Sequence, residues 1–423
     1  MKTSNITKPQ ETYTIFTILI IVYGLVLLTP LLAGMVGFGQ AFMLTMIVFL
    51  WILFFYKNLF KERVFYLIFS FFLLDLFYHL IGYSERIGNA FSHLVFFLNI
   101  IFFLSLRNII REKGNRVLFC CLLLIVIANV VDNIRLNTLY PMASIIAIRY
   151  DEFIGMNVGT TSFNTMTLLF YNLCFFLALN HTKWRLQVLF LICSLTSAYY
   201  IVMCGMRGSV VLIMALTTLL QIMAKWYYNN AFARMFVIIG GILSVLLYEL
   251  YQDVFFDFLA SILPEGRLID RVEDLSTTAE YGFDRHSFSG RYNLYLISIN
   301  SWLQNITTFL FGIGEHMESA KEIGYANSGV GGHSEFIDVF ARWGIIGAYL
   351  IFSIYYEAYK ILMQSFKGSH RNQVKILFFS FLMCTVFKKV FYPSIGIVFF
   401  ILVPLSSYFL YGMENSKKKH NKL

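Results

Sequence analysis

The chain has 423 residues, of which 58% are hydrophobic and only 13% are charged, about half the charged share of an average soluble protein. This composition excludes a soluble enzyme, and 45 Phe with 26 Tyr exclude a disordered protein, because so much aromatic surface must be buried in lipid or in protein. The net charge of +9 does not indicate nucleic-acid binding, because the basic residues form short clusters between apolar runs.

Apolar runs recur along nearly the whole chain. A hydrocarbon core of about 30 Å needs roughly 20 apolar residues of helix, and this template fits the sequence about twelve times. We therefore predict an all-α fold, a polytopic membrane helical bundle of about 12 transmembrane helices. The predicted spans are 14–32, 40–56, 64–83, 90–106, 117–131, 162–179, 186–204, 209–226, 235–249, 344–363, 374–392 and 394–411.

Basic residues favour one side of this predicted bundle. The positive clusters all fall in alternate connections, which is the positive-inside pattern of membrane proteins. Both termini are then predicted to be cytoplasmic, and most acidic residues lie in outward loops. The clusters occupy 57–63, 107–116, 183–185, 225–234, 367–371 and 417–419.

One outward connection, 251–343, is far longer than the others and is expected to be functional. Two of its segments, RYNLYLISINSWLQ (291–304) and SEFIDVFARW (334–343), place aromatic and aliphatic residues at helical spacing, which predicts helices in the membrane interface. Glycines at 312–314 and 324–332 predict turns in which the backbone can approach a ligand.

These patterns divide the chain into four parts. We predict N-terminal transmembrane helices one to nine in 1–250, a large extracytoplasmic loop with interfacial helices in 251–343, transmembrane helices ten to twelve in 344–411, and a basic cytoplasmic tail in 412–423.

Two arginines in outward connections have distinctive surroundings. Arg207 stands between glycines in CGMRGS, in a short turn where a guanidinium and the first amides of the next helix can meet an anion. The alternative is an interfacial arginine that extends toward water. Arg291 follows FSG and opens the first amphipathic segment, although a lone arginine in a polar loop is more often a solvated charge.

A histidine and a glutamate stand where the second amphipathic segment begins. Glycines precede His333, and Ser334 and Glu335 follow it. A helix N-terminus disfavours the imidazolium and keeps the ring neutral, as a general base requires, whereas Glu335 stabilises the charged form or orients the ring. A histidine beside glycines is equally compatible with a simple turn.

Two pairs of ionisable residues fall within or at the end of predicted spans. Asp75 and His79 are four residues apart on one helix face, which fits a proton relay, a substrate contact or a mutually hydrogen-bonded pair. Lys388 and Lys389 end a predicted span, where they can attract an anionic headgroup or extend outward. The sequence contains no Walker A loop, HExxH or Asp-x-Asp motif, and no cysteine pair at metal spacing, so we predict no metal and no cofactor.

Three segments carry a resemblance to a known family. They are MRGS at 206–209, SGR at 289–291 followed by an aromatic helix and FGIG at 311–314, and GHSEF at 332–336 ending in GIIG at 344–347. In this order, and in outward positions, they resemble the O-antigen and capsule polymerases (Wzy-type) of the O-antigen ligase and polymerase superfamily.

The resemblance implies an activity and its location. It implies glycosyl transfer between undecaprenyl-diphosphate-linked oligosaccharides, without metal, at the outer face of the bacterial cytoplasmic (inner) membrane. Arg207 and Arg291 would bind the departing diphosphate, and His333 would accept the proton of the attacking hydroxyl, with Glu335 as orienter or substitute base. Membrane lipid, a flippase and a chain-length regulator are the further partners implied.

Two other functions fit the same sequence. An O-antigen ligase would deliver finished polymer to another acceptor and belongs to the same superfamily. A lipid-linked oligosaccharide flippase would need binding groups near the midplane, for which Asp75, His79, Lys388 and Lys389 are the candidates.

Overall fold

The computed structural model describes residues 8–28, 30–56, 58–82, 87–109, 112–139, 161–205, 208–226, 287–314, 330 and 334–411. Within these ranges the regular structure is entirely helical. The helices are α1 (Lys8–Leu28), α2 (Pro30–Phe55), η1 (Leu59–Lys61), α3 (Arg63–Leu80), α4 (Ile87–Ile109), α5 (Glu112–Leu139), α7 (Thr161–Asn180), α8 (Trp184–Tyr199), η2 (Tyr200–Gly205), α9 (Gly208–Trp226), α12 (Ser287–Leu303), α13 (Ile306–Phe311), α15 (Glu335–Ser365), α16 (Gly368–Phe387), α17 (Pro393–Gly396), η3 (Ile397–Leu402) and α18 (Val403–Tyr411).

Seven helices in the described ranges are long and apolar enough to cross a membrane, so the prediction of an all-α membrane bundle is supported but the count of twelve spans is not. Three further apolar stretches of 10–17 residues, Tyr13–Leu28, Phe42–Phe54 and Ile213–Trp226, lie within α1, α2 and α9. The predicted span 235–249 lies outside the described residues.

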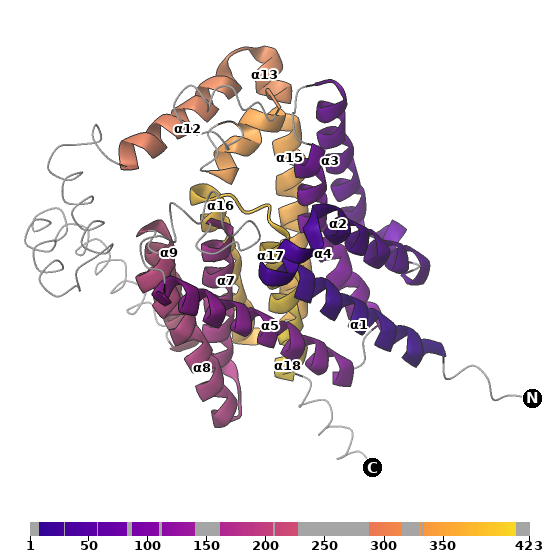
Figure 1. Cartoon of the computed structure of the whole chain (residues 1–423), viewed down its shortest axis with the longest axis vertical. Helices are drawn as coiled ribbons and strands as arrows, with labels where there is room; N and C mark the ends of the chain where they lie inside the picture. The colour runs from indigo at the N-terminus through magenta and orange to yellow at the C-terminus, as the bar shows by residue number, and fades with distance from the viewer. Residues whose placement is uncertain are drawn as a thin grey trace, which may run out of the picture.

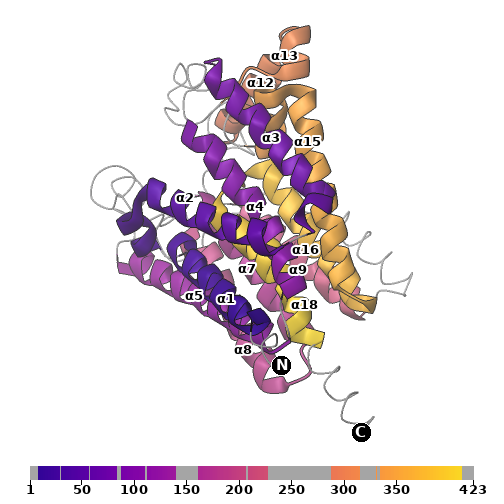
Figure 2. The ribbon, with the colours of Figure 1, turned by 90° about the vertical axis from the view of Figure 1, so that its right-hand side faces the viewer.

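The amphipathic helices of the large loop gather at one end of the bundle. Figures 1 and 2 show α12 and α13 beside the start of α15 and the end of α3, whereas the last turn of α18 lies at the opposite end. In both views α1, α2 and α5 run obliquely to the more upright α15. Helix α15 packs against α3, α12, α13 and α16, so it connects the loop helices to the bundle.

The two predicted amphipathic helices are present. Helix α12 (Ser287–Leu303) covers all but the last residue of the predicted segment 291–304 and begins four residues earlier. Helix α15 unites the segment 334–343 with the span predicted from Gly344, but Gly344 has non-helical dihedral angles (φ 59°, ψ −162°) and kinks the helix at the predicted boundary. A positive φ of this kind is readily adopted only by glycine.

Buried polar side chains join α7, α9 and α16. The amide of Asn172 in α7 accepts a hydrogen bond from Thr217 of α9 and donates one to Ser380 of α16, each at 2.9 Å. Asn180 donates to Gln373 of α16 at 2.6 Å. Because hydrocarbon offers polar groups no partner, such interhelical bonds fix the register of the three helices, with about 0.6 kcal/mol of stabilisation each.

Candidate functional site

The start of α15 is set by its own first residues. Ser334 is the N-cap, and its hydroxyl accepts a hydrogen bond from the Ile337 amide at 3.3 Å. Glu335 and Asp338 place negative charge in the first turn, where the helix dipole stabilises it. The Glu335 amide donates to the Lys388 carbonyl at 3.2 Å. The beginning of α15 is thereby joined to the residue that follows α16.

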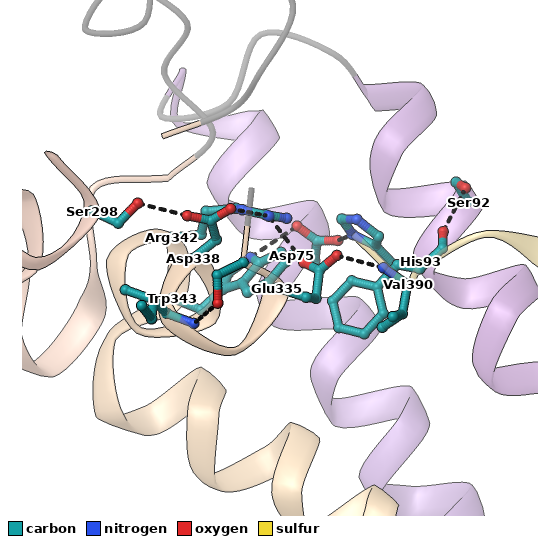
Figure 3. Close-up of polar contacts among 12 residues, drawn as sticks. Asp75, Ser92, His93, Ser298, Glu335, Asp338, Arg342, Trp343 and Val390 are labelled. Carbon is teal, nitrogen blue, oxygen red and sulfur yellow. Dashed lines mark hydrogen bonds and ion pairs between the residues drawn. The ribbon is translucent and has the colours of Figure 1, made fainter. Parts of the chain in front are cut away.

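One arginine serves two buried carboxylates on a single face of α15. Asp338 follows Glu335 by three residues, and Arg342 follows Asp338 by four. This spacing places the three side chains on the same face of a helix. Arg342 Nη2 lies 2.9 Å from Glu335 Oε1 and 3.5 Å from Asp338 Oδ2, and the Glu335 and Arg342 side chains are each only 3% exposed. Figure 3 shows the three side chains gathered between α12, α15 and the chain at Val390.

Neighbouring elements use the remaining carboxylate oxygens. Ser298 of α12 donates its hydroxyl to Asp338 Oδ1 at 2.6 Å, and the Val390 amide donates to Glu335 Oε2 at 3.2 Å. The positive charge of Lys389 also acts on Asp338. Glu335 therefore contacts the Arg342 guanidinium through Oε1 and the Val390 amide through Oε2.

A second buried acid connects α3, α4 and α15. Asp75 is 0% exposed, and its carboxylate contacts His93 Nδ1 of α4 at 2.8 Å and accepts from Trp343 Nε1 at 3.1 Å. The edge of the Trp343 ring meets the Phe71 ring, with the centroids 5.1 Å apart. Asp75 thus holds the residue just before the kink against two membrane helices (Figure 3).

The expected pairing of Asp75 with His79 needs correction. His79 Nδ1 contacts the backbone oxygen of Asp75 at 2.8 Å, whereas His93 and Trp343 contact the carboxylate. On a helix, a side chain can also reach the backbone carbonyl of the residue four positions before it. His79 makes this contact with the carbonyl of Asp75. The Asp75 side chain instead turns into the interface with α4 and α15.

Two glycines allow the segment 312–314 to pack against the kink of α15. Gly312 and Gly344 have φ of 75° and 59°, and a Cβ on either would overlap the backbone of the facing segment. The Ile313 and Gly314 amides donate to the carbonyls of Ala341 and Arg342 at 2.8 and 2.9 Å. These bonds satisfy the carbonyls that the kink releases from the helix. The predicted glycine turn at 312–314 is therefore hydrogen-bonded through its backbone to the kink of α15.

The other predicted site residues are placed as follows. The structure brings Glu335, Lys388, Lys389 and Asp75 to the same end of the bundle, where the side chain of Lys388 is also buried. Arg207 and His333 lie outside the described residues. Arg291 belongs to the first turns of α12, but its side chain is not described. Within the described ranges, no three His, Cys, Asp or Glu residues gather as a metal site.

Sequence reasoning missed four of the buried residues around Glu335 and Asp75, namely His93, Asp338, Arg342 and Trp343. His93 was findable, because Asp75 and His93 stand at equal distances from the connection near residue 84, so they face each other in a hairpin of two helices. Arg342 completes the spacing of Glu335 and Asp338 on one helix face. Trp343 has no local signal, because its bond to Asp75 joins residues 268 positions apart.

Comparison of the chain with protein-family models and with curated proteins finds no match. A functional conclusion therefore depends on the chain's own residues and on the geometry described above.

Proposed function

We propose that the chain is a membrane glycosyltransferase, a polysaccharide polymerase that joins undecaprenyl-diphosphate-linked oligosaccharide repeat units at the outer face of the bacterial cytoplasmic membrane. A hydroxyl of one repeat unit attacks the anomeric carbon of the other, a glycosidic bond forms, and the bond to the lipid diphosphate breaks. The reaction needs neither metal nor cofactor in this proposal.

Three side chains have separate roles in the proposed glycosyl transfer. His333 accepts the proton of the attacking hydroxyl. Arg207 and Arg291 bind the diphosphate, whose negative charge grows as it departs, so they stabilise the transition state more than the ground state. Glu335 orients the first turn of the helix that follows His333.

The observation that carries the proposal is the junction of α12 with the start of α15. Ser298 of α12 bonds Asp338 of α15, and it lies seven residues after Arg291, which is close to two full helical turns on the same face. His333 directly precedes the Ser334 cap of α15. This packing supports a common site for Arg291 and His333, because both positions border the same pair of helices.

Single substitutions test the proposal in cells that lack the native copy. Arg207→Ala, Arg291→Ala and His333→Ala are each expected to leave protein in the membrane at normal levels but to reduce the glycan ladder on a gel to single repeat units. Arg135→Ala is the matched control, because Arg135 is an exposed arginine that pairs with Asp132 at 2.9 Å and has no proposed role. Full ladders from all three variants would contradict the proposed site.

Reconstitution separates the polymerase from the two alternatives. Purified protein in liposomes with lipid-linked repeat units is expected to produce longer lipid-linked chains. Transfer of glycan to an added second acceptor without chain lengthening would indicate a ligase, and movement of the substrate between leaflets without new bonds would indicate a flippase.

A further inference from the structure

Helix α3 exposes a continuous apolar stripe along its length. Tyr66, Phe69, Leu73, Phe77 and Leu80 are separated by three or four residues, so they share one helix face, and all five are exposed. Figures 1 and 2 show α3 at the edge of the bundle. In a helix long and apolar enough to cross a membrane, such a face is suited to contact with lipid chains.

The short helix α13 also exposes apolar side chains at this end of the bundle. The Tyr78 hydroxyl donates a hydrogen bond to the Phe311 carbonyl, which joins the end of α13 to the last turn of α3. Ile306 is 71% exposed and Leu80 is 74% exposed, and Leu303 and Phe311 are exposed as well. Two separate parts of the sequence therefore expose apolar side chains at the same end of the bundle.

Several polar groups of the turn before α13 are hydrogen-bonded within the protein. The Asn305 side chain accepts from the Thr307 and Thr308 backbone amides at 2.9 Å each, and the Thr308 hydroxyl accepts from the Asn305 backbone amide at 3.0 Å. The indole of Trp302 donates to the Phe309 carbonyl at 3.1 Å. Internal hydrogen bonds lower the cost of bringing a backbone into hydrocarbon, and this capping box supplies three of them at the start of α13.

The depth of α13 follows from the length of α3. Arg63 begins α3 and pairs with Glu357 of α15 at 3.7 Å, which marks a polar layer at one boundary of the bundle. Tyr78 lies fifteen residues later, or about 22 Å along the helix at 1.5 Å per residue. Since the hydrocarbon core is about 30 Å thick, the level of Tyr78 and Phe311 falls inside it rather than above it.

We propose that α13 and the end of α12 insert into the lipid leaflet at this end of the bundle, so that acyl chains, and not a protein partner, cover Leu303, Ile306 and Phe311. The large loop is then anchored in the membrane through α13. The inference concerns a lipid contact and holds independently of the glycosyltransferase activity.

Depth-dependent quenching tests the insertion on the full chain in lipid nanodiscs. An environment-sensitive fluorescent amino acid is placed at Ile306, with the same probe at Leu73 as the lipid-facing control and at Thr182, an exposed position between α7 and α8, as the aqueous control. The nanodiscs contain phosphatidylcholine brominated on the acyl chain, near the headgroup for the probe at 306 and near the chain end for the deeper probe at 73, and iodide is the aqueous quencher.

The probe at 306 is expected to lose most of its fluorescence to brominated lipid and little to iodide, as at 73. Quenching by iodide as strong as at 182 would overturn the inference, and so would protection from both quenchers, which indicates a protein contact. Each labelled protein must elute as a single peak in size-exclusion chromatography. Because all three positions are exposed, the probe does not disturb the core.

Discussion

Replacing Arg342 by methionine removes the cation shared by two buried carboxylates. Arg342 Nη2 lies 2.9 Å from Glu335 and 3.5 Å from Asp338, and all three side chains are at most 3% exposed. Breaking a buried ion pair costs roughly 3–5 kcal/mol, because the remaining charge stays buried without its partner. Since Arg342→Met affects two carboxylates, we expect a loss in the upper part of this range.

The exposed pair between Arg63 and Glu357 provides a matched control. Its atoms are 3.7 Å apart and the Arg63 side chain is 64% exposed, so Arg63→Met is expected to cost at most about 1 kcal/mol. Thermal unfolding of both variants in detergent, followed by tryptophan fluorescence, gives the comparison. Adding Asp338→Asn to Arg342→Met should restore part of the loss, since it removes one of the two buried negative charges. Equal melting temperatures for Arg342→Met and Arg63→Met would refute the reasoning.

Two further predictions concern stability. Gly368→Ala places alanine at a φ of 56°, which costs roughly 1–2 kcal/mol. Gly344→Ala should lower the melting temperature clearly further, because φ 59° with ψ −162° is a conformation that essentially only glycine adopts and the new Cβ would overlap the Leu310 carbonyl; equal losses would show that 312–314 and the kink of α15 are not closely packed. Burial, and secondly the charge of Lys183, lower the pKa of His181 from its usual 6.5. The folded state therefore resists protonation of His181, so the stability contributed by the neutral ring should be full above pH 6.5 and fall as the pH drops below it. His181→Gln should reduce this fall between pH 7.5 and 5.5. An unchanged pH profile of the melting temperature would contradict the assignment of the fall to His181.

Local pattern predicted the loop helices and the kink of α15 because each depends on nearby residues. Aromatic residues at helical spacing define α12, and a glycine at 344 after an amphipathic segment marks the bend. The predicted count of twelve spans is not supported. Hydropathy identifies an apolar run, but it does not show how the helix lies, and α2 runs obliquely to α15 in Figure 1.

The candidate site was only partly predictable because its bonds join distant segments. Glu335 and Lys388 were identified as separate candidates, and their backbone contact became visible only in the fold. The charge of Asp75 indicated a buried polar contact, yet proximity in sequence favoured His79, whereas helix packing selects His93 and Trp343. Sequence spacing predicts neighbours on one helix, but neighbours between helices depend on rotation and register.

The buried cluster and the proposed catalytic residues should respond differently to substitution. The carboxylates of Asp75, Glu335 and Asp338 are held by side chains or a backbone amide inside the protein, so the loss of a partner such as Arg342 leaves a buried polar group without its contact and lowers stability. Buried ion pairs often add little net stability over apolar residues, and they are better explained by the one geometry that they specify. In this protein that geometry is the kinked start of α15 held against α3, α12 and α16. Substitutions that stop glycan polymerisation without lowering the melting temperature would therefore identify catalytic residues, whereas cluster variants should lower both together.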